Sequence, residues 1–276
     1  MPRIGLVQMT SSDDPAANLA MASDLVARAA GEGAEFVLTP EVTNCISGQR
    51  AHQEAVLRPE AEDPTLAGLR QAALRHGVWL LIGSLGLKLP GEARFANRSL
   101  LITPEGEIAA RYDKIHMFDV NVSETEIYRE SAGYRPGERA VTAATPFGTL
   151  GLTICYDIRF PHLYRALAQA GAEILTVPAA FNHLTGAAHW EVLLRARAIE
   201  TGCFVLAPAQ CGTHPSQDNR GRRSHGHSLV VAPWGEVLAD GGTAPGVVIA
   251  DLDLAEVGRA RGRVPSLGHD RAFAGP

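Results

Sequence analysis

Residues 148–161, Gly-Thr-Leu-Gly-Leu-Thr-Ile-Cys-Tyr-Asp-Ile-Arg-Phe-Pro, place a cysteine between a predicted strand and a predicted helix. The residues before Cys155 are mostly aliphatic or β-branched, which is typical of a buried strand. Pro161 and the apolar positions after it predict a helix with proline in its first turn. A thiol at a strand exit is held rigidly, close to backbone N–H groups that can stabilise an oxyanion. Cys155 is therefore a candidate nucleophile, the alternative being an ordinary buried cysteine.

A carboxylate and an ammonium group also follow predicted strands. Glu41 comes after the apolar run 35–40, and Lys114 follows the strand-like run 108–112. In layered α/β folds the ends of strands meet at one crevice. A single Glu or Lys in a loop is usually a solvated charge, but three strand ends with complementary chemistry favour a shared site.

Strand and helix signals alternate along the whole sequence. Asp14-Pro15 and Asp63-Pro64 each combine a capping residue with a proline at the first helical position. The segments 33–40 (Gly-Ala-Glu-Phe-Val-Leu-Thr-Pro) and 171–178 (Gly-Ala-Glu-Ile-Leu-Thr-Val-Pro) are near copies. This echo, and the absence of a Pro/Ser-rich linker, predict one α/β domain over residues 1–276 that contains two similar halves.

Three blocks of sequence resemble the signature blocks of the nitrilase superfamily, the carbon–nitrogen hydrolases with a Glu-Lys-Cys triad. The blocks are Pro40-Glu41, the segment 112–119 (Tyr-x-Lys-x-His-x-Phe-Asp) and the segment 155–161 (Cys-Tyr-Asp-x-Arg-Phe-Pro). The stretch 185–200 is similar to the branch that contains deaminated-glutathione amidases and ω-amidases. His162 and Ala187 depart from the pattern, which usually has Glu and Pro there. The resemblance implies a four-layer αββα sandwich of the nitrilase type.

The chemistry of amide hydrolysis assigns a role to each residue of the triad. Cys155 would attack the carbonyl, Glu41 would act as general base, and Lys114 with the N–H of Tyr156 would hold the oxyanion. A carboxylate is a poor base for a thiol unless its pKa is raised, so Glu41 should be desolvated, and a neighbouring cation should favour the thiolate. The resemblance adds Glu130 as a second glutamate that orients Lys114 and the substrate; the alternative is a surface charge.

Arg159 is a candidate for binding a substrate carboxylate, because its planar guanidinium can make two parallel hydrogen bonds. The alternative is an internal salt bridge with Asp157 or Glu173. The resemblance favours carboxylate binding and implies further substrate-lining residues. The predicted substrate-binding set is Tyr156, Arg159, Phe118, Phe181 and Thr185.

The predicted function is hydrolysis of a small, carboxylate-bearing amide of the keto-acid type through a cysteine thioester, with release of ammonia. Deaminated glutathione is the favoured substrate, and the alternatives are α-ketoglutaramate, as for an ω-amidase, a nitrile or another aliphatic amide. Two other classes stay open. One is a thiol hydrolase with His162, His183 or His189 as the base, and the other is a non-catalytic binding protein with the same fold.

The composition of the chain indicates which partners and which cellular compartment to expect. The net charge of −5 gives no sign of a nucleic-acid partner, and no apolar run is long enough for a membrane span. A signal peptide is not expected, so a protein with a free thiol is expected in the cytoplasm. The partners expected are the amide substrate and water, with a second copy of the chain in a homodimer implied by the resemblance. The C-terminal tail, 259–276, is expected to be disordered or docked on that copy.

No metal or other cofactor is expected. The four cysteines match neither a disulfide framework nor a zinc pattern. His225-Gly-His227 lacks an accompanying cluster of cysteines or carboxylates. The basic cluster at 220–223 (Arg-Gly-Arg-Arg) lies in a polar loop and is expected to face solvent.

Overall fold

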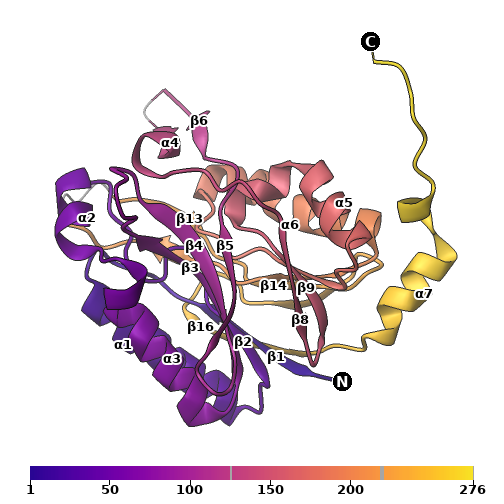
Figure 1. Cartoon of the computed structure of the whole chain (residues 1–276), viewed down its shortest axis with the longest axis horizontal. Helices are drawn as coiled ribbons and strands as arrows, with labels where there is room; N and C mark the ends of the chain where they lie inside the picture. The colour runs from indigo at the N-terminus through magenta and orange to yellow at the C-terminus, as the bar shows by residue number, and fades with distance from the viewer. Residues whose placement is uncertain (125, 218–220, 276) are drawn as a thin grey trace.

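The computed structural model describes residues 1–124, 126–217 and 221–275. Two six-stranded sheets pack face to face, with helices on their outer faces (Figure 1). This arrangement is the four-layer αββα sandwich that the resemblance implies, so the predicted fold class is confirmed. Within the described residues, no helix is long and apolar enough to cross a membrane.

Both sheets mix parallel and antiparallel strands. The first contains, in spatial order, β16 (Gly246–Asp251), β1 (Arg3–Gln8), β2 (Phe36–Leu38), β3 (Trp79–Leu87), β4 (Ala96–Ile102) and β5 (Ile108–Asp113). The second contains β15 (Val237–Asp240), β14 (Leu229–Val231), β11 (Phe204–Ala207), β10 (Ile174–Thr176), β9 (Gly148–Leu152) and β8 (Val141–Thr145). Two short antiparallel pairs lie outside the sheets, β6 (Asp119–Asn121) with β7 (Ile127–Arg129) and β12 (Cys211–Thr213) with β13 (Arg223–His225).

The helices begin where the sequence predicts. The Asp14 side chain accepts a hydrogen bond from the N–H of Ala16 at 2.9 Å, and Asp63 caps its helix through the N–H of Leu66 at 2.8 Å. The α-helices are α1 (Pro15–Gly31), α2 (Arg50–Val56), α3 (Pro64–His76), α4 (Glu130–Gly133), α5 (Pro161–Gln169), α6 (His183–Thr201) and α7 (Ala255–Arg263). Short 3-10 helices occupy Glu60–Glu62, Cys155–Arg159 and Ser266–Gly268.

The two near-copy segments occupy matching places in the two sheets. Segment 33–40 contains β2, which lies between its parallel neighbours β1 and β3. Segment 171–178 contains β10, which lies between its parallel neighbours β9 and β11. The predicted similarity of the two halves is therefore confirmed at the level of sheet topology.

Side chains of the central strands alternate between two apolar layers. Leu6 and Leu38 face the layer between the sheets, whereas Val7 and Val37 face the layer beneath α1 and α3. Both faces of these strands are covered, which explains why their sequences are nearly continuous apolar runs. The strand ends are consequently fixed by packing on two sides, as a site built at one edge of the sheets requires.

The C-terminal segment 259–276, predicted to be a tail, begins inside α7. Beyond that helix, Arg165 and Gln169 of α5 donate hydrogen bonds to the carbonyls of Ser266 and Leu267 at 2.8 and 3.0 Å. Gln169 also donates to Asp270 Oδ2 at 2.6 Å, so the segment contacts its own chain as far as Asp270. Phe273 is 90% exposed, and Figure 1 shows the C-terminus leading away from the sandwich.

Candidate active site

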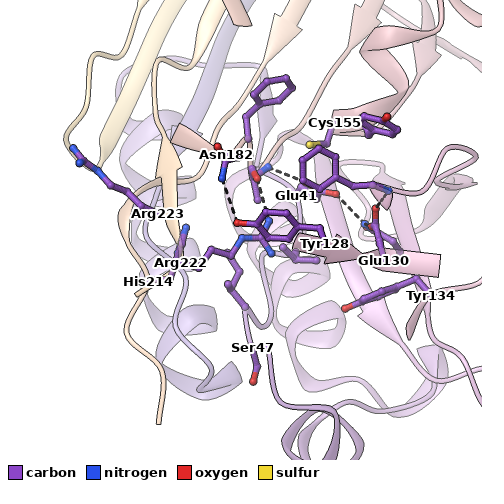
Figure 2. Close-up of a pocket in the computed structure, with 18 of the residues that line it drawn as sticks. Glu41, Ser47, Tyr128, Glu130, Tyr134, Cys155, Asn182, His214, Arg222 and Arg223 are labelled. Carbon is purple, nitrogen blue, oxygen red and sulfur yellow. Dashed lines mark hydrogen bonds between the residues drawn. The ribbon is translucent and has the colours of Figure 1, made fainter. Parts of the chain in front are cut away.

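Three residues that follow strands of the two sheets lie together in the interior (Figure 2). Glu41 follows β2, Lys114 follows β5 and Cys155 follows β9. The Nζ of Lys114 donates to Glu41 Oε1 at 2.8 Å, and both side chains are almost fully buried. Cys155 is 7% exposed. The strand ends therefore meet in one place, and they bring a thiol, a carboxylate and an ammonium group with them.

Glu130, the first residue of α4, also belongs to this cluster. Lys114 Nζ lies 2.9 Å from each of its carboxylate oxygens, and the N–H of Phe118 donates to Oε2 at 2.6 Å. The short β6–β7 pair between Lys114 and α4 turns the chain back, which places Glu130 beside a residue far from it in sequence. One ammonium group is thus shared by two carboxylates.

Asn97 of β4 is a member of the cluster that sequence reasoning missed. Its Nδ2 donates to Glu41 Oε1 at 2.9 Å and to Glu130 Oε1 at 3.3 Å. The sequence did contain a signal for Asn97, namely a polar residue within an apolar strand. A buried amide needs hydrogen-bond partners, so such a residue indicates a polar cluster nearby. Asn97 Oδ1 is buried and has no hydrogen-bond partner among the described residues.

Cys155 occupies a strained turn at the start of a 3-10 helix. Its φ is 48°, which is uncommon for a residue other than glycine, and its N–H donates to the carbonyl of Pro178 at 2.9 Å. The next N–H, that of Tyr156, has no bonded acceptor among the described residues. Such an unsatisfied donor at the start of a helical turn is suited to hold an oxyanion formed at Cys155.

Asp157, two residues after the thiol, joins the Cys155 turn to the segment that carries Lys114. It is fully buried and accepts from the N–H of Ile154 at 2.9 Å and from the hydroxyl of Tyr112 at 2.6 Å. It also accepts from the backbone N–H of His116 at 3.0 Å and lies 2.7 Å from the Nδ1 of that residue. These partners occupy the carboxylate, and the structure gives it no salt bridge to Arg159.

Electrostatic coupling sets the charges of the cluster. Burial raises the pKa of the Cys155 thiol well above its ordinary value, and Glu41 raises it further, whereas Lys114 opposes the shift only in part. Burial also acts against the Glu41 carboxylate, but Lys114 and the N–H of Ala180 outweigh it and lower the pKa of Glu41. Burial disfavours the Lys114 ammonium too, yet Glu130 and Glu41 hold the pKa of Lys114 well above its ordinary value.

The resting site therefore contains a neutral thiol, two carboxylates and one ammonium group. Glu41 is desolvated as predicted, but the expected rise in its pKa and the expected thiolate at Cys155 are not found. The Lys114 ammonium and the Ala180 N–H stabilise the Glu41 carboxylate, whereas burial and that neighbouring carboxylate disfavour a second anion at Cys155. A thiol in these surroundings would have to lose its proton in order to act as a nucleophile.

A cavity of about 500 Å³ opens onto the cluster. Four of the predicted substrate-binding residues line it, namely Tyr156, Phe118, Phe181 and Thr185. Arg159 is not among the residues that line it. Its guanidinium carbon lies 5.8 Å from the centre of the Tyr156 ring and 5.4 Å from that of Phe181, and Nη2 lies 3.3 Å from His189 Nδ1.

Two arginines and a histidine in the cavity wall were not predicted to be there. Arg222 and Arg223 were expected in a solvent-facing loop, and the structure places both at the rim of the cavity as well as in contact with solvent. Arg220 lies outside the described residues. His214 lines the same wall and is buried. No sequence signal separated these arginines from other loop charges, because their position depends on how the β12–β13 pair packs.

The other histidines singled out from the sequence lie in different surroundings. His227 pairs with Asp240 at 3.0 Å, and its ring lies 4.7 Å from that of His225. His162 packs edge-on against His116, whereas His183 lines the cavity. In the parts of the chain that the structure describes, no three His, Cys, Asp or Glu side chains are arranged to hold a metal ion.

Comparisons with known proteins agree with this geometry. A deaminated glutathione amidase of Synechocystis sp. is 42% identical over 266 residues, 95% of this chain and 96% of the relative. The solved NitFhit protein of C. elegans superposes with a TM-score of 0.89 at 37% identity, covering 98% of this chain and 65% of that chain. A mutant amidase from Nesterenkonia sp. AN1, solved with acrylamide added to its active-site cysteine, has a TM-score of 0.78 at 29% identity, covering 96% and 98%. A model of the carbon-nitrogen hydrolases matches residues 3–262, and this chain therefore belongs to that family, within the nitrilase superfamily.

Proposed function

We propose that this carbon–nitrogen hydrolase cleaves the amide bond of deaminated glutathione, with Glu41, Lys114 and Cys155 as its catalytic triad. The observation that carries the proposal is the buried cluster in which Lys114 Nζ binds Glu41 and Glu130 beside a strained Cys155. The substrate assignment is supported by relatives of that name from Synechocystis to Homo sapiens, which align over nearly all of this chain.

The first half of the reaction forms a thioester. Cys155 Sγ attacks the amide carbonyl carbon while Glu41, the carboxylate beside the thiol, accepts the thiol proton. The carbonyl oxygen becomes an oxyanion that Lys114 Nζ and the N–H of Tyr156 stabilise. Glu41 then gives its proton to the amide nitrogen, the carbon–nitrogen bond breaks, and the amine leaves.

The second half returns the enzyme to its starting state. Glu41 removes a proton from water as the oxygen attacks the thioester carbon. The carbon–sulfur bond breaks, Cys155 regains a proton, and the carboxylic acid leaves. Glu130 and Asn97 position Lys114 and Glu41 through both halves, since each binds a member of the triad. Every proton transferred by Glu41 is returned within one turnover.

The identity of the leaving group corrects the expectation of ammonia. Deaminated glutathione is a secondary amide, in which the carbon–nitrogen bond joins a keto-acid to cysteinylglycine. Its hydrolysis releases α-ketoglutarate and that dipeptide, whereas ammonia is released only from primary amides such as α-ketoglutaramate. An assay that detects ammonia alone would miss the proposed reaction, so the amine and the acid must both be measured.

The test compares kcat/KM for deaminated glutathione, α-ketoglutaramate, propionamide and a small nitrile. We expect the highest value for deaminated glutathione. A higher value for α-ketoglutaramate would make the protein an ω-amidase, and no turnover of any amide by protein with a titratable Cys155 thiol would contradict the proposal. Cys155→Ala serves as the inactive variant. Cys211→Ala removes a buried thiol outside the cluster and serves as its matched control.

The alternative with a cysteine–histidine pair has less support. Among the described residues, no histidine is bonded to Cys155, and His189 is engaged with Arg159. The same triad chemistry also argues against a non-catalytic binding protein. A Lys114→Met variant separates the two thiol mechanisms, because only the triad mechanism needs that ammonium.

We further propose that residues 1–276 act as one domain within a cytoplasmic homodimer. The four cysteines are all unpaired, which suits a reducing compartment. Large apolar side chains are exposed on α6 and near the C-terminus, at Val192, Ile199, Val264 and Phe273, and these support an interface. Light scattering on the purified protein tests the oligomeric state, and a monomer at micromolar concentration would contradict it.

A further inference from the structure

The β12–β13 pair fixes the backbone of Arg222 at the rim of the catalytic cavity. The N–H of His214 donates to the Arg222 carbonyl at 2.9 Å, just beyond the end of β12. His214 is itself buried, with ring nitrogens 2.8 Å from the Ser11 carbonyl and 2.7 Å from Ser224 Oγ. Arg222 is therefore attached to a well-anchored turn and not to a free surface loop.

The side chain of Arg222 points along the cavity wall toward the triad. Its Nη2 donates to the carbonyl of Ala180 at 3.1 Å. The backbone N–H of Ala180 in turn donates to Glu41 Oε2 at 2.8 Å. The guanidinium carbon lies 6.0 Å from the centre of the Tyr128 ring (Figure 2). Figure 2 shows the side chain of the neighbouring Arg223 pointing the other way.

The start of α6 adds features that favour an anion at the same wall. Asn182 caps this helix by accepting from the N–H groups of Leu184 and Thr185, and it pairs with Ser224 of β13. The positive end of the α6 dipole therefore lies next to the segment that carries Arg222. His183 lines the cavity, and its Nδ1 is buried with no partner among the described residues.

Most other charges in the cavity wall have partners that occupy them. Lys114 binds Glu41 and Glu130, and Glu126 accepts from Asn182 at 2.6 Å. Arg129 donates to the carbonyls of Val120 and Tyr128. The bond to Ala180 engages one of the five N–H donors of the Arg222 guanidinium.

We propose that Arg222, with His183 beside it, forms a subsite that binds a carboxylate of the substrate. The inference rests on the proposed amidase function and names the feature of the substrate that this cavity selects. A planar guanidinium fixed at one nitrogen can present its remaining donors to both oxygens of a carboxylate. Two carboxylates of deaminated glutathione could fill the subsite, the one on the keto-acid and the one on the terminal glycine. Arg159, which does not line the cavity, is assigned no such contact.

The test measures KM and kcat for Arg222→Met, Arg222→Lys and the control Arg75→Met, which removes an exposed arginine of α3 outside the cavity. The substrates are deaminated glutathione, the same compound with its glycine carboxylate converted to an amide, and α-ketoglutaramate. We expect Arg222→Met to raise KM for deaminated glutathione about tenfold to hundredfold, the scale of a charged hydrogen bond, with kcat changed less than about twofold. Arg222→Lys keeps the positive charge but lacks the planar guanidinium, so its KM should lie between those of wild type and Arg222→Met. Arg75→Met should leave KM near the wild-type value.

The substrates identify which carboxylate is bound. If Arg222 binds the glycine carboxylate, Arg222→Met leaves KM for the amidated compound and for α-ketoglutaramate unchanged. If it binds the keto-acid carboxylate, KM rises by the same factor for all three compounds. Equal effects of Arg222→Met and Arg75→Met, or an unchanged KM for every substrate, would overturn the subsite. Failure of wild type to hydrolyse any of the three would instead remove the proposed function, so the two failures are distinguishable.

Discussion

Replacing Asp157 by Asn tests whether this carboxylate holds the Cys155 turn against the Lys114 segment. The wild-type side chain accepts at Oδ1 from the N–H of His116 and at Oδ2 from the N–H of Ile154. It also binds the Tyr112 hydroxyl and the His116 ring. An asparagine keeps the shape but offers one oxygen, so whichever way it turns, its amino group faces a backbone N–H.

The expected loss of stability follows from those contacts. The Tyr112 hydroxyl and the His116 ring can each accept a hydrogen bond, so they can adapt to an amino group, but the backbone N–H cannot. One buried N–H without a partner costs about 1–3 kcal/mol, and the remaining bonds lose about 1 kcal/mol as they change from charge-assisted to neutral. We therefore expect the free energy of unfolding of Asp157→Asn to fall by about 2–4 kcal/mol. We also expect a fall in kcat of about 100-fold, because the triad is displaced.

The assay is urea unfolding followed by circular dichroism, with kcat measured on the folded variant. Glu191→Gln, which breaks an exposed ion pair with Arg195 on α6, is the control and should leave the unfolding midpoint unchanged. An Asp157→Asn protein that unfolds at the wild-type urea concentration would contradict the loss of stability that we assign to its hydrogen bonds. A stability loss with full kcat would show that Asp157 supports the fold without positioning the triad.

The remaining predictions concern the triad and the wall of the cavity. Cys155→Ala should keep the wild-type unfolding midpoint and lose turnover, and a variant that retains a tenth of the wild-type rate would exclude Cys155 as the nucleophile. Intact-mass spectra of the wild type with a slow substrate should show an acyl group on Cys155 alone. Lys114→Met and Glu41→Gln should each lower kcat by several orders of magnitude, and their losses should not add in the double variant; near-additive losses would show that they act separately. The pKa of His214 is lowered from 6.5 to about 4 by burial and by Arg222, so the folded protein binds fewer protons there than the unfolded chain. Its contribution to stability is complete above pH 6.5, and about 2 kcal/mol of it is lost by pH 5. Urea unfolding of wild type and His214→Asn at pH 7.5 and 5 measures that difference, and an equal pH effect in both proteins would contradict it.

The sequence predicted those features that depend on short-range pattern. Helices capped by Asp14 and Asp63 begin at the next residue, since the caps and the prolines act within one turn. The sandwich and the meeting of Glu41, Lys114 and Cys155 follow from strand ends and from the resemblance of three blocks. Charge states were less accessible, because the pKa of Glu41 depends on the groups that the fold brings to its side chain. The N–H of Ala180, which helps to lower that pKa, was placed beside Glu41 only by the fold.

Long-range packing decided the features that the sequence did not reveal. Arg159 lies close to Cys155 in the chain, yet it does not line the cavity, because its guanidinium is held near the Tyr156 and Phe181 rings. Arg222 is much farther along the chain and reaches the carbonyl of Ala180. The sequence around a loop arginine does not indicate which cavity wall it will line, so Arg222 was not among the residues predicted from the sequence.

The echo between segments 33–40 and 171–178 explains how two sheets build one site. The prolines that end the two segments, Pro40 and Pro178, both lie against Gly83 of β3. A Cβ on Gly83 of β3 would lie 2.0 Å from the Thr39 carbonyl oxygen and 2.5 Å from the Cβ of Pro178, so no larger residue fits there. After Pro40 comes Glu41, and two residues after Pro178 comes Ala180, whose N–H binds the Glu41 carboxylate at 2.8 Å. The carbonyl of Pro178 in turn holds the N–H of Cys155. Glu41 and Cys155, the proposed base and nucleophile, are thus aligned by backbone bonds between equivalent strand ends, and Ala180 also accepts a bond from Arg222 at the rim.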